Sequence, residues 1–91
     1  MRKASAARAV RAEAKAGLKT GCVSIAEVLE RGADDTAIAR LRVHEMLKAL
    51  PGVGDVRAAS IMEQVGIAPS RRIRGLGVHQ RQALIRYLAG N

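Results

Sequence analysis

The sequence predicts an all-α protein built around one small core, and three observations lead to this fold class. The chain has 91 residues, which is enough for one domain and too few for two. Its apolar residues are aliphatic, since Phe and Trp are absent and Tyr87 is the one aromatic residue. Ala, Glu, Lys and Arg, which favour helices, are frequent, and apolar residues recur at helical spacing. No segment has the alternating pattern of a strand.

A basic helix is expected from about Ala4 to Lys19, within a basic N-terminal segment that we place at residues 1–22. Spacings of three and four residues put its cations on one stripe, which consists of Arg8, Arg11, Lys15 and Lys19. A weaker apolar stripe on another side consists of Ala7, Val10, Ala14 and Leu18. The cationic stripe either binds a polyanion or is a solvated charged face, and its pattern alone favours neither.

The remaining residues, 23–91, are expected to form the compact part of this single domain. Ser24-Ile-Ala-Glu27 has the spacing of a capping box, so a short helix should start there and end near Gly32. Asp34 or Asp35 can cap the next helical stretch. That stretch has a break near Arg42 and should stop before Pro51, because proline disfavours helix in the residue that precedes it.

Two more helices are expected after Pro51. Ala58, Ile61, Met62 and Val65 lie at helical spacing, and Gly66 fits the left-handed cap that ends such a helix. Residues 67–77 then form a loop that is long for so small a domain, and long loops tend to be functional. The last helix should cover about residues 78–88.

The charge of the chain indicates a polyanionic partner. Formal net charge is +8 and the calculated pI is about 11.1. Residues 1–24 hold six basic residues and one acid, residues 25–51 hold four and five, and residues 52–91 hold six and two. No acid occurs from residue 64 to residue 91. The two basic ends are therefore expected to face the same anionic surface.

Two glycine-containing loops have the chemistry of phosphate binding. In Leu50-Pro-Gly-Val-Gly54, glycines allow positive φ and a close approach of another backbone, and the following helix start adds free N–H groups. In Arg71-Arg-Ile-Arg-Gly-Leu-Gly77, three guanidinium groups can each donate paired hydrogen bonds to a phosphate. The alternatives are a helical corner without a ligand and a surface charge cluster.

The residues of these loops resemble known DNA-binding elements. The LPGVG hairpin is similar to the helix-hairpin-helix corner, and residues 55–88 resemble the helix-two-turn-helix domain of a ribosomal protein and of some DNA glycosylases. Through LPGVG, VRAASIM, GIAPSRRIRGLG and HQRQAL, the chain resembles the actinobacterial integration host factor family. This resemblance implies a nucleoid-associated protein that binds duplex DNA with little sequence preference and bends or compacts it. It implies DNA contacts at Pro51, at the Gly52–Gly54 turn and at the three loop arginines.

Two positions depart from the pattern of that family. Asp55 stands where relatives usually carry lysine, which puts a carboxylate beside the hairpin unless it caps the helix. Val78-His79 replaces a polar pair that would cap the last helix. The full set of residues expected to contact DNA is Arg8, Arg11, Lys15, Pro51, Gly52, Val53, Gly54, Arg57, Ser70, Arg71, Arg72, Arg74, Gly75, Gly77 and Arg81.

Other functional classes are less well supported. No catalytic constellation or metal-ligand spacing is found, so neither an enzyme nor a bound cofactor or metal is expected. The single cysteine, Cys22, is expected to be a small buried residue. No apolar run approaches the length of a membrane span, and we expect a cytoplasmic monomer at the nucleoid. The alternative partner is RNA or the ribosome, although the chain lacks aromatic residues on which single-stranded bases stack.

Overall fold

The computed structural model describes residues 2–89, with side chains from residue 7 onward, and over this range it confirms the all-α fold class. Six α-helices and one 3₁₀ turn follow in order: α1 (Arg2–Thr20), α2 (Ile25–Asp34), α3 (Thr36–Ala39), α4 (Val43–Lys48), α5 (Asp55–Val65), η1 (Ile73–Gly75) and α6 (Val78–Ala89). Extended pairing within this range is limited to one isolated bridge. None of the helices that the structure describes is long and apolar enough to cross a membrane.

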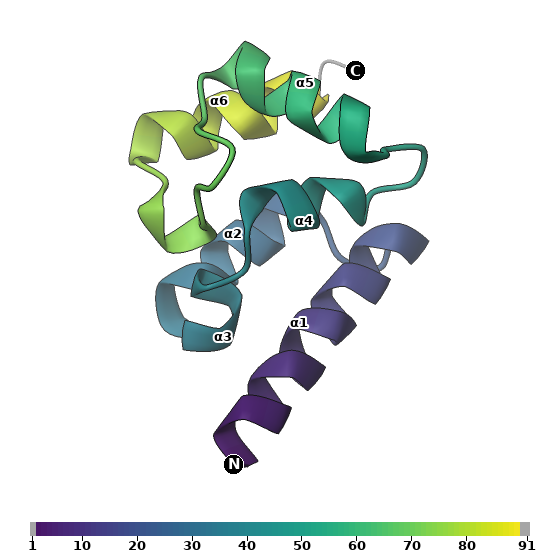
Figure 1. Cartoon of the computed structure of the whole chain (residues 1–91), viewed down its shortest axis with the longest axis vertical. Coiled ribbons are helices and arrows are strands. Elements are labelled where there is room, and N and C mark those ends of the chain that lie inside the picture. Colours follow the sequence, from purple (N-terminus) through teal and green to yellow (C-terminus); the bar gives the residue numbers. More distant parts are fainter. Residues whose placement is uncertain (1, 90–91) are drawn as a thin grey trace.

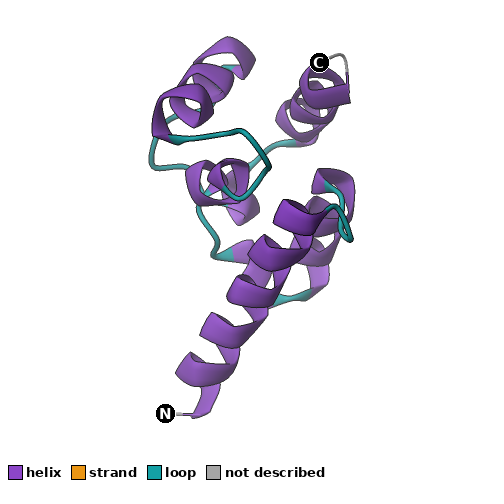
Figure 2. Ribbon diagram, turned by 90° about the vertical axis from the view of Figure 1, so that its right-hand side faces the viewer, coloured by secondary structure: helices purple, strands orange, loops and turns teal. Residues whose placement is uncertain are grey.

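The helices form a small bundle from which α1 projects. α1 packs on α3, α2 packs on α3 and α6, and α5 packs on both α4 and α6. The N-terminal half of α1 extends beyond the other helices in both views, and α5 and α6 lie at the opposite end of the molecule (Figure 1, Figure 2). The principal extents are 38 × 26 × 20 Å. The long dimension therefore follows the direction in which α1 projects.

The core is aliphatic, as the composition predicts. Every side chain classed as buried between residues 7 and 89 is apolar. These residues come from all six helices, from the link between α3 and α4 and from the loop after α5, and they are Ala14, Leu18, Ile25, Val28, Leu29, Ile38, Leu41, Val43, Met46, Leu47, Ala58, Ile61, Met62, Ile67, Ile73, Leu76 and Leu84. Ala14 and Leu18 of the apolar stripe of α1 are less than 2% exposed. The C-terminal half of this helix is thus part of the core.

Several helix ends form as their sequence signals predict. The Ser24 hydroxyl accepts a hydrogen bond from the Glu27 N–H at 3.2 Å, and the Asp35 carboxylate accepts one from the Ala37 N–H at 2.9 Å. Gly66 ends α5 with φ at +86°, and the Ile67 N–H returns to the Met62 carbonyl at 2.8 Å. That return places the buried Ile67 side chain against the last turn. The predicted break near Arg42 is the interval between α3 and α4.

Gly32 differs from its expected role at the end of a helix. It lies inside α2, which continues to Asp34. A Cβ atom at this position would come within 2.6 Å of the Ile73 Cγ2 atom. Glycine is therefore required here because the η1 turn of the arginine-rich loop rests directly on the backbone of α2.

The expectation that Cys22 is buried is wrong, because its side chain is exposed. The chain reverses at Gly21, which has φ at +84°, and the Val23 N–H then donates to the Gly17 carbonyl at 3.2 Å. Val23 takes the inward position of this turn, since its Cγ2 atom lies where a Cβ atom on Gly17 would be placed. Cys22 is left at the outside of the turn.

The last helix is capped by a residue that the sequence does not single out. The Gln80 side-chain oxygen accepts from the Gly77 N–H at 3.1 Å, and the Gln80 amide donates to the Gly66 carbonyl at 3.2 Å. Gln80 thereby joins the start of α6 to the end of α5. It compensates for the missing polar pair at Val78-His79.

Candidate nucleic-acid interface

The arginine-rich loop is held against the segment that links α3 to α4. The Ile73 N–H donates to the Leu41 carbonyl at 2.9 Å, and the Val43 N–H donates to the Arg71 carbonyl at 3.0 Å. These two hydrogen bonds form the isolated antiparallel bridge between Arg42 and Arg72. The loop is therefore fixed by backbone bonds to a segment about thirty residues away in the sequence.

The bridge places two arginines opposite each other. The hydrogen bonds join the residues on either side of Arg42 and Arg72, so these two form a pair that is not itself hydrogen-bonded. Side chains approach more closely in such pairs than in hydrogen-bonded ones. Like charges directly opposite each other are destabilising in the free protein. An anion between them would relieve this repulsion, so the bridge favours a phosphate ligand.

Two arginine side chains donate hydrogen bonds to nearby backbone carbonyl groups. The Arg72 guanidinium donates to the Arg40 carbonyl at 3.2 Å, and the Arg11 guanidinium donates to the Ala37 carbonyl at 3.5 Å. A carbonyl does not neutralise the charge of a guanidinium, which keeps its remaining N–H donors. Both arginines are thus oriented by the fold and still available to an anion.

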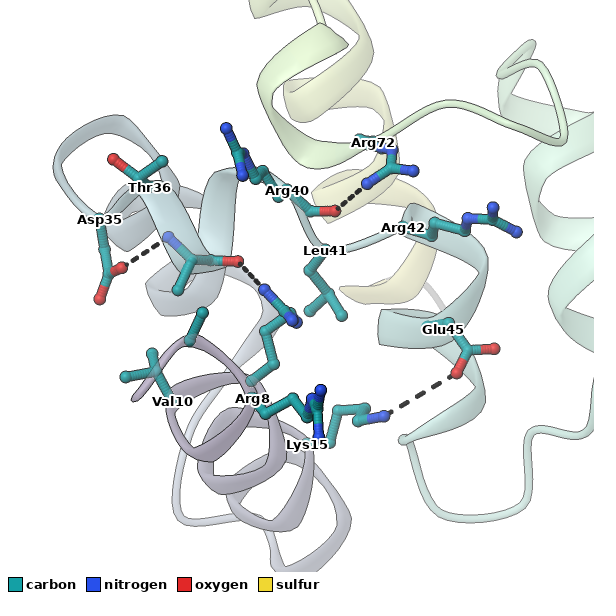
Figure 3. A pocket seen from close by; sticks show the side chains of 13 residues that line it. Arg8, Val10, Lys15, Asp35, Thr36, Arg40, Leu41, Arg42, Glu45 and Arg72 are labelled. Carbon is teal, nitrogen blue, oxygen red and sulfur yellow. Dashed lines mark hydrogen bonds and ion pairs between the residues drawn. The ribbon is translucent and has the colours of Figure 1, made fainter. Parts of the chain in front are cut away.

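These residues line a groove between α1 and the α3–α4 segment (Figure 3). Its volume is about 1020 Å³. Two carboxylates, Asp35 and Glu45, lie among its walls, and Asp35 is engaged in capping α3. The cationic residues outnumber them, and they are Arg8, Arg11, Lys15, Arg40, Arg42 and Arg72. The groove therefore joins the stripe of the first helix, the α3–α4 link and the arginine-rich loop.

A second hollow extends this cationic surface to the glycine hairpin. Lys15 and Glu45 line both hollows, and the second also includes Pro51, Gly52 and Val53. Its further basic side chains are Lys19 and Lys48. We call the combined lining of the two hollows the cationic face. It includes Arg72 in the first hollow and Gly52 in the second.

The hairpin offers backbone donors at the end of this face. Gly52 has φ at +78°, and the Val53 N–H is engaged with the Leu50 carbonyl at 3.2 Å. The N–H groups of Gly52 and Gly54 have no acceptor among the residues that the structure describes. Gly54 starts α5 without a side-chain cap. The free amides at this helix start are suited to a phosphate oxygen.

Asp55 pairs with a lysine and does not cap α5. Its carboxylate lies 3.0 Å from the Lys48 ammonium and 3.8 Å from the His44 Nε2 atom. The hydrogen bond and charge of Lys48 hold the pKa of Asp55 below its usual range, and Asp55 in turn raises the pKa of Lys48. The negative charge beside the hairpin is therefore balanced across the α4–α5 connection.

The structure brings together only part of the set of expected DNA contacts. Arg8, Arg11, Lys15, Arg72 and the residues from Pro51 to Val53 line the cationic face, and Gly54 directly follows them. Arg57 lines a third hollow, which shares the hairpin residues from Leu50 to Val53 with the second hollow. Six residues, all from the loop or the start of α6, line none of these three hollows: Ser70, Arg71, Arg74, Gly75, Gly77 and Arg81.

Within the loop, the side chain of Arg71 packs against Gly75. The Arg71 guanidinium donates to the Gly75 carbonyl at 3.3 Å, and a Cβ atom on residue 75 would lie 2.8 Å from the Arg71 Cδ atom. Gly75 thus leaves space for the arginine side chain to fold across the turn. Arg71 and Arg74 are exposed, and they lie in the chain on either side of the buried Ile73 without lining the cationic face.

Arg40 and Arg42 line the groove but are not among the residues expected to contact DNA. They lie in residues 25–51, where basic and acidic residues nearly cancel, so regional charge does not indicate them. The signal that was present is local, because the two arginines flank the buried Leu41 at the break between two helices. Arg40 ends α3 in helical conformation and Arg42 precedes α4 in extended conformation, and both are exposed on either side of the buried Leu41.

A short helical hairpin, a long ordered loop and a last helix define this molecule as a protein of the S13-like helix-two-turn-helix class. The family described as the S13-like H2TH domain matches residues 18–88. Integration host factor of Streptomyces coelicolor is 48% identical over 86 residues, which cover 94% of this chain and 80% of that protein. Integration host factor of Mycobacterium tuberculosis is 46% identical over 85 residues, covering 93% and 81%. The chain therefore belongs to the actinobacterial integration host factor family.

A solved structure agrees with this assignment. The structure of sIHF bound to an 8bp palindromic DNA matches with a TM-score of 0.92 and 47% sequence identity. The match covers 96% of this chain and 98% of that one. The related protein therefore has the same overall arrangement of helices and loops as this chain.

Proposed function

We propose that this protein is nucleoid-associated, acts in the cytoplasm, and binds double-stranded DNA through the phosphate backbone with little sequence preference. The observation that carries the proposal is the Arg42–Arg72 bridge, which sets two arginine residues opposite each other in the lining of one cationic face. A polyanion bound to this face would reduce the repulsion between the two positive charges. The solved relative bound to DNA identifies duplex DNA as the polyanion to test first.

Low sequence preference follows from the chemistry of the face. Its donors are guanidinium groups, ammonium groups and backbone amides, all of which suit phosphate oxygens. Phosphate contacts fix position on a duplex and carry no base information. Aromatic residues, which stack on unpaired bases, do not line either of the two hollows. The protein is thus expected to bind unrelated duplexes with similar affinity.

Salt dependence provides the direct test. If about six basic side chains contact phosphates, log K should fall with log salt at a slope of about −5, from roughly −0.9 for each contact. The measurement is a binding titration at several salt concentrations on two unrelated DNA duplexes and one RNA duplex of equal length. A slope shallower than about −2, or tighter binding to RNA, would contradict the proposed function.

DNA bending is the second part of the proposal. The cationic face runs along a molecule whose longest dimension is 38 Å, and α1 and the hairpin lie at different places along it. A duplex that contacts both places is expected to bend, at a cost of about 1–6 kcal/mol for bends of roughly 40–90°. Contacts from both ends of the face would offset this cost.

The bending test requires substitutions in α1. Deleting the helix would remove Ala14 and Leu18 from the core, so the variant should instead replace Arg8, Arg11 and Lys15 with glutamine. We expect a smaller bend, measured by energy transfer between the labelled ends of a short duplex at saturating protein. If the saturated complex is as bent as with the unchanged protein, α1 does not take part in bending.

A further inference from the structure

Glu45 occupies the centre of the cationic face. It lies in the first turn of α4 and lines both hollows of that face. One carboxylate oxygen lies 3.8 Å from the Lys15 ammonium, and the other lies 3.7 Å from the Lys48 ammonium. Glu45 therefore places a negative charge beside Lys15 in the lining of the cationic groove (Figure 3).

The basic residues of this face fall into two groups. No arginine among residues 7–89 has an ion pair, and the hydrogen bonds of Arg11 and Arg72 go to carbonyl groups. Lys15 and Lys48, in contrast, are paired with acids. The arginines and Lys19, which lines the second hollow without an ion pair among the described residues, are thus open to phosphate in the free protein, whereas Lys15 and Lys48 already have a negative neighbour.

The ion pairs of Glu45 with Lys15 and Lys48 are exposed and weak. The side chains of Lys15, Lys48 and Glu45 are 39%, 36% and 42% exposed, and the nitrogen-oxygen distances to Glu45 exceed hydrogen-bond length. Pairs of this kind contribute little to stability because water screens the charges. A phosphate can therefore take the place of Glu45 beside a lysine without disturbing the core.

On the basis of the proposed function, we propose that Glu45 is a built-in counterion that lowers both the affinity for DNA and its dependence on salt. Binding to a free lysine releases a mobile cation from the DNA, and this release produces the salt dependence. Glu45 is tethered to α4 and stays beside the incoming phosphate, so repulsion offsets part of the gain. Lys48 keeps Asp55 as a partner at 3.0 Å, so the effect of Glu45 acts mainly through Lys15.

The test is the substitution Glu45→Gln, which removes the charge and keeps the size of the side chain. We expect duplex binding about three- to tenfold tighter near 50 mM salt. The slope of log K against log salt should become steeper by about 1, which corresponds to one additional free basic residue at roughly 0.9 per contact. The gain in affinity should then shrink about threefold between roughly 50 and 200 mM salt.

Glu63→Gln is the matched control. Glu63 is exposed on α5, lines none of the three hollows and has no ion pair among the described residues. The Glu63→Gln variant has the same change in net charge as Glu45→Gln. Its slope of log K against log salt should equal that of the unchanged protein. A second comparison uses Lys15→Gln, in which adding Glu45→Gln should no longer steepen the slope.

The outcomes separate the two proposals. Equal affinities and slopes for the Glu45 and Glu63 variants would overturn the role of Glu45 and leave DNA binding intact. A steeper slope that persists without Lys15 would also overturn it, because Lys15 is the residue through which Glu45 acts. If the unchanged protein has no salt-dependent affinity for duplex DNA, the proposed function itself is wrong. Circular dichroism and thermal midpoints of the variants establish that each is folded.

Discussion

Replacing Arg71, Arg72 and Arg74 together with alanine is expected to weaken binding to every duplex by about 100- to 1,000-fold near 0.1 M salt. Each arginine lost from a phosphate removes a charge-assisted contact of about 1.5 kcal/mol or less after desolvation. The slope of log K against log salt should also become shallower by roughly 0.9 for each lost contact. A salt-titrated binding assay on unrelated sequences measures both quantities.

The controls for this variant follow from the hydrogen bonds of the loop. Arg71 and Arg72 also donate to the carbonyls of Gly75 and Arg40, so their loss affects the loop as well as its charge. Arg74 has no such bond within the described residues, and Arg74→Ala alone tests the charge. Arg86→Ala, at an exposed site on α6, makes the same change in charge outside the cationic face. Loss of affinity at one sequence with full affinity elsewhere would instead indicate base reading.

Ile73→Ala should have the largest effect on stability among substitutions in the loop. Ile73 is 3% exposed and lies between Arg72 and Arg74, with its Cγ2 atom against the backbone of Gly32. Removing a buried isoleucine side chain costs about 2–4 kcal/mol, because the surroundings fill the cavity only in part. That is a large fraction of the roughly 5–15 kcal/mol by which small domains are stable. Urea unfolding measures the loss.

The same variant should bind DNA more weakly, because the arginines on either side of Ile73 lose their anchor. Ile73→Val keeps most of the contact and should cost only about 0.5–1.5 kcal/mol. Val56→Ala, at a side chain that is 85% exposed, should change the free energy of unfolding by less than about 0.5 kcal/mol. If Ile73→Ala were as mild as Val56→Ala, packing on α2 would not be what holds the loop in place.

Gly32 is a glycine that the sequence pattern predicts at the end of a helix and that serves tertiary packing instead. Glycine near the end of a helical pattern predicts a cap, and the same pattern is correct at Gly66, which has φ at +86°. Gly32 instead lies inside α2, and the side chain of Ile73 occupies the space that a Cβ atom would need there. Only the contact between α2 and η1 distinguishes the two cases, and that contact joins residues far apart in the sequence.

The sequence likewise predicts some features of the candidate site and not others. The phosphate-binding chemistry of the hairpin and of the loop arginines is readable from glycine and arginine spacing. The contribution of Arg40 and Arg42 is not, because it depends on the bridge to Arg72. Sequence also does not reveal that Lys48 balances Asp55, or that Glu45 lies between Lys15 and Lys48.

By itself, the sequence determined the helical class, the positions of most helix ends, the aliphatic core and the excess of positive charge. These properties depend on side-chain type and on spacings of at most four residues, which act within a single helix. Tertiary structure alone decided which cations share a face, which of them are neutralised, and why Gly32 lacks a side chain. Most of those outcomes depend on backbone hydrogen bonds, ion pairs and packing between segments about thirty to forty residues apart, which no local pattern specifies.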